Sequence, residues 1–96
     1  MRMKDRVALV TGAGGPMGMA VAKRFAEEGA SLVITDISAT RLAEGERAVA
    51  EAAGSADKVV ALRTNAMVRG ELEDLVAAGR EKFGSIQILA NIVGGY

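Results

Sequence analysis

The stretch RVALVTGAGGPMG, residues 6–18, decides the fold. It joins an apolar run to a turn rich in glycine, and a helical pattern of apolar residues follows. We expect a buried strand over residues 6–11, because a short, uninterrupted apolar run is typical of a strand covered on both faces. We expect a helix over residues 16–28 that ends at Gly29. The inner face of this helix is expected to carry Met17, Val21 and Phe25, which are spaced four residues apart.

The rest of the chain continues this alternation of strand and helix. Strands are expected over residues 31–35, 58–62 and 86–90. A second helix, capped by Ser38, should run to about Ala53 and end at Gly54, and a third should begin near Arg69 and close at Gly84. Their inner faces are expected to carry Leu42, Val49 and Ala53 in the second helix, and Leu72, Leu75, Val76 and Phe83 in the third. The order β-α-β-α-β-α-β predicts the α/β class, as a partial, Rossmann-like, doubly wound parallel sheet of four strands.

Composition narrows the possible functions. The chain has 96 residues, enough for one small domain, and its 12 basic side chains balance its 12 acidic ones. This neutral balance gives no electrostatic support for nucleic-acid binding. Without histidine or cysteine, the chain by itself cannot form a disulfide framework, a typical zinc site or a Ser-His-Asp triad. The apolar run 7–10 is too short for a signal segment or a membrane span, which predicts a cytoplasmic protein without membrane contact.

The turn between the first strand and the first helix has the composition of a phosphate-binding loop. A phosphate group needs accessible backbone N–H groups at the N-terminus of a helix. Gly12 allows the tight turn, Gly14 and Gly15 remove side chains from the approach, and Gly18 lets the helix lie close to the sheet. Pro16 occupies the first helical turn, where its missing N–H matters little. The alternative is a flexible loop that merely starts a helix, and the position between a strand and an amphipathic helix argues against it.

Asp36 follows the second strand, 24 residues after Gly12. A carboxylate at this place can accept hydrogen bonds from the ribose hydroxyls of NAD, and it would repel the 2′-phosphate of NADP. Ile37 beside it brings no positive charge for that phosphate. The alternative is an aspartate that only caps a turn. In combination with the glycine turn, the pattern favours NAD as the cofactor over NADP.

Residues 6–18 and 33–37, together with KFGSIQILANIVG at residues 82–94, resemble the short-chain dehydrogenase/reductase family. Thr11, Gly12 and Gly18 match the family's Thr-Gly-x-x-x-Gly-x-Gly motif, whereas Pro16 replaces its middle glycine. The resemblance implies that Asn65 takes the place of an aspartate that contacts adenine. It also implies that Asn91 and Gly94 belong to the Asn-Asn-Ala-Gly turn, in which Ile92 and Val93 depart from the family pattern. The cofactor-binding residues expected from all these arguments are Gly12, Gly14, Gly15, Met17, Gly18, Asp36, Ile37, Asn65, Ala66, Asn91 and Gly94.

The resemblance covers nearly the whole chain but less than half of a typical family member. The family's catalytic Ser and Tyr-x-x-x-Lys set is absent, and the one tyrosine, Tyr96, is assigned no catalytic role. We therefore expect residues 1–96 to form a single partial NAD(P)-binding domain that lacks the catalytic half. It would be inactive alone and would belong to an oxidoreductase that moves hydride between nicotinamide and an alcohol or carbonyl. Two alternatives stay open: a non-catalytic nucleotide-binding module, and a half-domain that forms a homo-oligomer, or pairs with a complementing half, through its fourth strand.

Overall fold

A computed structural model describes residues 3–65 and 68–92. Strands and helices alternate along the described residues, as the sequence predicts. The elements are β1 (Val7–Thr11), α1 (Pro16–Glu27), β2 (Ser31–Ile34), α2 (Ala39–Ala53), a short 3-10 helix η1 (Ala56–Lys58), β3 (Val59–Ala61), α3 (Arg69–Phe83) and β4 (Ile88–Asn91).

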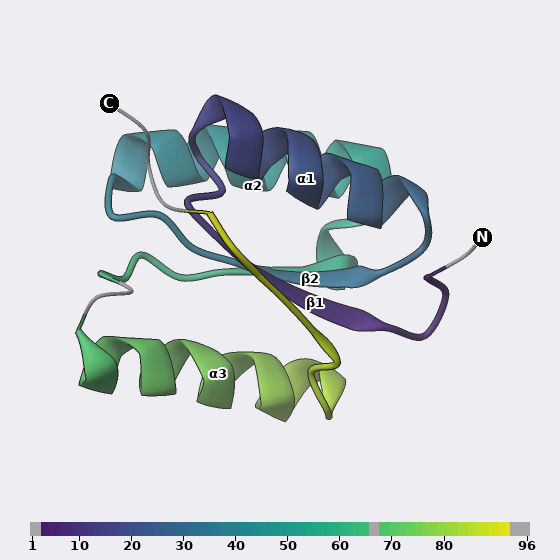
Figure 1. The fold of residues 1–96 in the computed structure, drawn as a ribbon. Coiled ribbons are helices and arrows are strands. Elements are labelled where there is room, and N and C mark those ends of the chain that lie inside the picture. The colour runs from purple at the N-terminus through teal and green to yellow at the C-terminus, as the bar shows by residue number, and fades with distance from the viewer. Residues whose placement is uncertain (1–2, 66–67, 93–96) are drawn as a thin grey trace.

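The four strands form one parallel sheet in the order β3-β2-β1-β4. Helices α1 and α2 lie together on one face, and α3 covers the other (Figure 1). The chain therefore moves outward from β1 to β3 and then crosses back, through α3, to place β4 beside β1. The reversal of direction lies between β1 and β4, and the carboxyl ends of strands at such a reversal form the usual ligand crevice of open α/β sheets. The predicted Rossmann-like fold class is confirmed.

The central strands β1 and β2 are buried on both faces, which explains their uninterrupted apolar runs. In β1, Ala8 and Val10 face the core beneath α1 and α2, whereas Val7 and Leu9 face the core above α3. Each strand residue alternates between the faces, so both helical layers need apolar partners from the same strand. The core beneath α1 and α2 is the larger of the two and contains many alanines.

The predicted inner face of α1 is wrong. The buried residues are Gly18, Ala22 and Ala26, one position further along the chain than Met17, Val21 and Phe25. Met17 keeps 68% of its surface exposed, and Phe25 is only partly buried. Small side chains let α1 approach the sheet closely, so the face with the smallest residues, and not the most apolar face, turns inward.

The other elements differ from prediction mainly at their ends. Ser38 caps α2, since its hydroxyl oxygen accepts a hydrogen bond from the Arg41 amide at 3.2 Å, and Gly54 ends α2 in a left-handed conformation. Strand β4 begins at Ile88, two residues later than predicted, because its pairing with β1 starts at Ala8 opposite Ile88. In α3, only Leu75 and Gly79 are fully buried, and the other predicted inner residues are partly buried around them.

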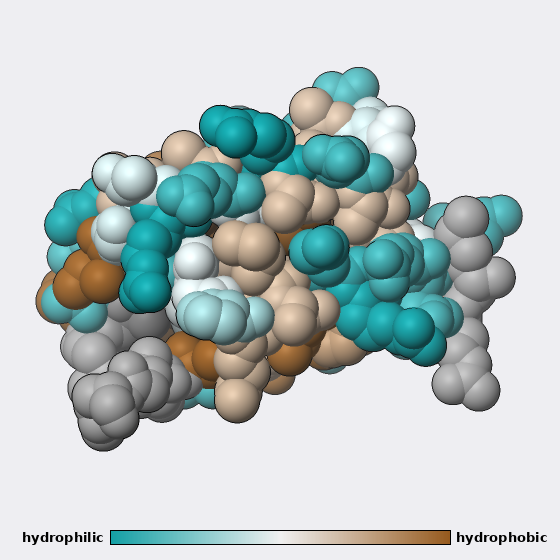
Figure 2. All heavy atoms as spheres, turned by 90° about the horizontal axis from the view of Figure 1, so that it is seen from above, coloured by the Kyte–Doolittle hydropathy of each residue, from teal (hydrophilic) through white to brown (hydrophobic). Residues whose placement is uncertain are grey.

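The face formed by α1 and α2 carries a weakly apolar strip bordered by polar side chains (Figure 2). This pattern agrees with the alanine-rich composition of both helices. Within residues 3–65 and 68–92, no helix has both the length and the apolar character that crossing a membrane requires.

Candidate functional site

The glycine turn lies at the carboxyl end of β1, beside the position where the sheet reverses direction. Gly12 has a φ of +65°, which L residues with side chains rarely adopt. A Cβ atom on Gly12 would also lie only 2.5 Å from the carbonyl oxygen of Ile92, which follows β4. A Cβ on Gly18 would overlap the carbonyl oxygen of Gly12. Both motif glycines are therefore required by close approaches of the backbone, as the sequence predicts for Gly18.

Helix α1 begins without a side chain that could satisfy its first amides. Its N-cap is Gly15, and its first turn contains the uncharged residues Pro16, Met17, Gly18 and Met19. The Met19 amide donates to the Gly15 carbonyl at 2.9 Å. The amides of Met17 and Gly18 belong to the first turn, where an α-helix offers no acceptor of its own. The positive end of the helix is thus open to an anion.

The backbone amides of the other two glycines of the turn already donate hydrogen bonds within the protein. The Gly14 amide donates to Asp36 Oδ2 at 2.9 Å, and the Gly15 amide donates to the Gly12 carbonyl at 3.1 Å. A Cβ on Gly14 would meet helix α2 at Arg41, whereas a Cβ on Gly15 would meet only Gly12 at an ordinary 3.6 Å. The structure thus gives Gly14 a role that the sequence did not predict. It brings the turn against α2 and the end of β2.

Asp36 lies two residues beyond the end of β2 and is nearly buried, with 7% of its surface exposed. Its second carboxylate oxygen, Oδ1, accepts from the Ser38 amide at 2.9 Å. The carboxylate therefore joins the glycine turn to the start of α2. A carboxylate has about four acceptor positions, so it keeps capacity for hydroxyl groups that approach from outside.

Side-chain hydrogen bonds hold the strand ends together around the turn. The Thr11 hydroxyl donates to Asn91 Oδ1 at 2.7 Å and accepts from the Ile92 amide at 3.0 Å, which ties β1 to β4. The hydroxyls of Thr35 and Thr64 share a buried hydrogen bond of 2.7 Å, which ties the end of β2 to the segment after β3. The sequence reasoning missed the threonine pair, since its members are 29 residues apart in the chain.

The remaining predicted residues lie around the end of β2 and the end of β3. Ile37 is 57% exposed, and its carbonyl accepts from Arg63 Nε at 2.9 Å. The Arg63 guanidinium thus brings a positive charge beside Ile37, which the sequence reasoning did not expect. The backbone amide of Asn65 donates to Glu71 Oε1, and the backbone carbonyl of Asn65 accepts from the Val68 amide. Ala66 and Gly94 lie outside the described residues.

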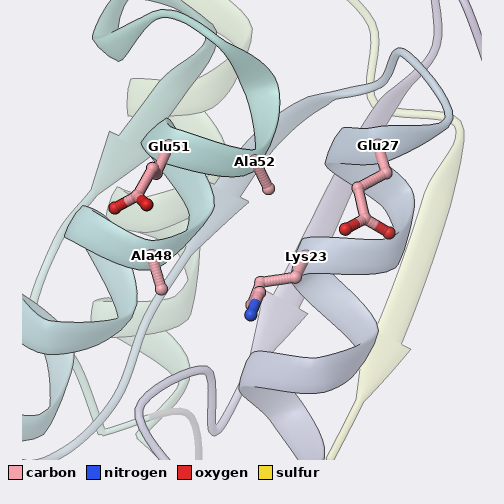
Figure 3. A pocket seen from close by; sticks show the side chains of 5 residues that line it. All are labelled: Lys23, Glu27, Ala48, Glu51 and Ala52. Atoms are coloured by element: carbon pink, nitrogen blue, oxygen red, sulfur yellow. The ribbon is translucent and has the colours of Figure 1, made fainter.

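A separate shallow groove of about 280 Å³ lies between α1 and α2, away from the predicted residues (Figure 3). Helix α2 contributes two alanines and a glutamate to its lining, and α1 contributes a lysine and a glutamate. Its lining residues are Lys23, Glu27, Ala48, Glu51 and Ala52. None of these belongs to the glycine turn or to the ends of β1 and β2, so the groove is not part of the candidate site.

Comparison with known proteins supports a single family. The model of the short chain dehydrogenase family matches residues 6–96. The 2-(R)-hydroxypropyl-CoM dehydrogenase of Xanthobacter autotrophicus is 39% identical over 90 residues, which are 94% of this chain and 35% of that protein. The chain thus spans about a third of the length of this curated relative.

Two solved structures are similar in fold and sequence. A short-chain dehydrogenase/reductase from Burkholderia phymatum in complex with NAD has a TM-score of 0.83 and 31% identity, covering 93% of this chain and 31% of that one. Actinorhodin polyketide ketoreductase (F189W) with NADPH has a TM-score of 0.84 and 30% identity, covering 94% and 33%. Because the family model matches almost the whole sequence, and the fold agrees, the chain belongs to the short-chain dehydrogenase/reductase family.

Proposed function

We propose that this chain supplies the dinucleotide-binding part of an NAD(P)-dependent short-chain oxidoreductase. The observation that carries the proposal is the open start of α1, where the Met17 and Gly18 amides lie at the reversal of the sheet. A pyrophosphate placed there would accept from these amides and from the positive end of the helix dipole. The two similar structures described with NAD and with NADPH support a nicotinamide dinucleotide as the ligand.

NAD is the cofactor that Asp36 favours. Its carboxylate lies at the end of β2, where the ribose of a dinucleotide would lie in this fold. Ribose hydroxyls would donate to its remaining acceptor positions, whereas a 2′-phosphate would place a second negative charge against it. Arg63 opposes this preference, since its guanidinium is exposed next to Ile37. We expect the buried carboxylate to dominate, because water screens the exposed cation more strongly.

Each residue proposed for the cofactor site is assigned to one part of the dinucleotide or to the support of the turn. The amides of Met17 and Gly18 would meet the pyrophosphate, Asp36 and Ile37 the adenosine ribose, and Asn65 the adenine. Gly12, Gly14 and Gly15 shape the turn, and Asn91 holds the β1–β4 junction through Thr11. Ala66 and Gly94 complete the proposed set as predicted from the sequence alone.

Isothermal titration calorimetry tests the binding proposal. We expect heat on addition of NAD and of ADP-ribose, and weaker binding of NADP. If neither NAD nor ADP-ribose binds at millimolar concentration, the chain is not a dinucleotide-binding domain. If ADP-ribose binds but the protein oxidises no alcohol and reduces no carbonyl with either NAD or NADP, the alternative of a non-catalytic module is favoured.

We further propose that the parent enzyme moves hydride between nicotinamide and an alcohol or carbonyl substrate. The chain spans about a third of a curated dehydrogenase relative. The Tyr-x-x-x-Lys set that family chemistry uses is absent from residues 1–96. We infer that residues 1–96 by themselves turn over no substrate. An assay of the purified residues with NAD and a series of alcohols tests this, and any reduction of NAD that depends on the alcohol would contradict it.

A second candidate function concerns the edge of the sheet. β4 is an edge strand, and Leu89 keeps 67% of its surface exposed. Unpaired strand edges recruit further strands. We propose that β4 pairs with a strand from a second copy or from a complementing half. Analytical ultracentrifugation tests this for residues 1–96, and a compact monomer at high concentration would contradict it.

A further inference from the structure

Helix α2 contains a buried glycine that its own conformation does not require. Gly45 lies in the interior of α2 (Ala39–Ala53), and glycine there destabilises a helix by about 1 kcal/mol relative to alanine. A Cβ atom on Gly45 would lie 2.8 Å from the carbonyl oxygen of Ala13 and 3.5 Å from Gly14 Cα. The missing side chain is therefore explained by contact with the glycine turn, which α2 approaches backbone to backbone.

The same contact extends one helical turn toward the start of α2. Arg41 precedes Gly45 by four residues, so both lie on one face of the helix. A Cβ on Gly14 would lie 2.5 Å from Arg41 Cβ and 2.6 Å from the Arg41 carbonyl carbon and oxygen. Glycine is thus present on both sides of the contact, at position 14 of the turn and at position 45 of the helix.

Helix α2 cannot easily move away from the turn. Leu42 and Val49, which flank Gly45 on the inner face, are 6% and 0% exposed and belong to the main core. The start of α2 is held by the Ser38 amide, which donates to Asp36. A methyl group added at Gly45 would therefore press on the Ala13 carbonyl, and the turn must shift if the helix keeps its place in the core.

The turn is attached to the end of β2 by hydrogen bonds that a displacement would strain. The Ala13 amide donates to the Thr35 carbonyl at 2.9 Å, and the Gly14 amide donates to Asp36 Oδ2 at 2.9 Å. We propose that Gly45 is a positioning residue for the dinucleotide site. It allows α2 to hold the turn where the first amides of α1 meet a pyrophosphate. This inference rests on the proposed function.

Affinities for two ligands separate this role from a general effect on stability. ADP-ribose carries the pyrophosphate, whereas adenosine carries only the part that would meet the end of β2. In the full-length protein, we expect Gly45→Ala to raise the Kd of ADP-ribose about tenfold, the effect of losing one hydrogen bond to a charged group. The Kd of adenosine, followed by NMR titration, should change by less than about twofold, well below the effect of one lost hydrogen bond.

Two helical glycines in α3 provide matched controls. A Cβ on Gly79 would lie 2.5 Å from Val33 Cγ2, so Gly79→Ala disturbs the core without reaching the turn. A Cβ on Gly70 would meet open space among the described residues. Neither Gly79→Ala nor Gly70→Ala should change the ratio of the two dissociation constants, although Gly79→Ala should lower the free energy of unfolding. If Gly79→Ala changes the ratio as much as Gly45→Ala does, the effect is general, and the role of Gly45 is contradicted.

The remaining outcomes are also decisive. If the wild type binds ADP-ribose and Gly45→Ala binds it equally well, the positioning role is wrong while the proposed function stands. If the wild type does not bind ADP-ribose, the proposed function fails, and this inference fails with it. If Gly45→Ala does not fold, Gly14→Ala places a methyl group in the same contact from the other side. It should show the same selective loss, and an unchanged ratio would contradict the proposal.

Discussion

The carboxylate of Asp36 accepts a hydrogen bond from the backbone amide of Gly14 at 2.9 Å, and the two residues are 22 positions apart in the sequence. This bond connects the glycine turn after β1 to the end of β2, and the other oxygen of the same carboxylate accepts the Ser38 amide. The residue expected to choose the cofactor therefore also holds the loop that would bind its phosphates. Stability and cofactor preference are coupled at this side chain.

Replacement of Asp36 should reveal both roles. In Asp36→Ala, the Gly14 and Ser38 amides lose their acceptor, and we expect the free energy of unfolding in urea to fall by about 1–3 kcal/mol. NAD should bind more weakly, and the ratio of NAD to NADP affinity should fall about tenfold because the charge that repels the 2′-phosphate is gone. Calorimetry with both cofactors measures this ratio. An unchanged ratio would mean that Asp36 serves only to hold the turn.

Gly15 offers a change with opposite effects on stability and binding. Its backbone is extended, as at an N-cap, and a Cβ there makes only an ordinary contact. In Gly15→Asp, the carboxylate should accept the Met17 or Gly18 amide and raise the free energy of unfolding by about 0.5 kcal/mol. The new carboxylate should also abolish binding of ADP-ribose, because it would accept the hydrogen bonds that these amides are proposed to donate to the pyrophosphate. Gly15→Ala, which cannot cap, is the control and should retain binding; retained binding in Gly15→Asp would place the phosphates elsewhere.

Gly18 tolerates no side chain, according to its contact with Gly12. In Gly18→Ala, the new methyl group would overlap the Gly12 carbonyl oxygen, and α1 must move away from the sheet. We expect a loss of about 1–3 kcal/mol in the free energy of unfolding, as for other overpacked sites. Urea denaturation monitored by circular dichroism measures it. The Gly70→Ala variant, which meets open space among the described residues, should be at least as stable as the wild type.

The Thr11 hydroxyl should contribute to stability through its two hydrogen bonds to the β4 end. Thr11→Val keeps the branched shape but removes the group that donates to Asn91 and accepts from Ile92. We expect the free energy of unfolding to fall by about 1–2 kcal/mol, because the partners are only partly buried. Thr11→Ser retains the hydroxyl and should lose less. A Thr11→Val variant as stable as the wild type would contradict this contribution of the hydroxyl.

The edge of β4 should govern self-association of residues 1–96. Leu89 is 67% exposed on this edge strand, and a charged side chain there opposes pairing with a second strand. We expect Leu89→Lys to shift sedimentation toward the monomer at concentrations where the wild type associates. Thermal unfolding should change little, since the side chain is largely in water. Association that is insensitive to Leu89→Lys would exclude pairing through this edge.

The sequence by itself determined the order of the elements and the position of the glycine turn. Both follow from local patterns: apolar runs, the Ser38 cap, and glycines between a strand and a helix. The tertiary structure decided which residues these elements bring together. It turned Gly18, Ala22 and Ala26 of α1 inward, because close packing on the sheet rewards small side chains that local hydrophobicity ranks low.

Tertiary structure also decided how the candidate site is held. The bond from Gly14 to Asp36, the packing of Gly45 against Ala13, and the Thr11–Asn91 bond join residues that are 22 to 80 positions apart. No periodic pattern encodes such pairs, since each depends on the distance between elements after they pack. The sequence therefore predicted the glycine turn and the strand ends that form the candidate site, whereas the fold determined which of their amides and oxygens already form hydrogen bonds within the protein.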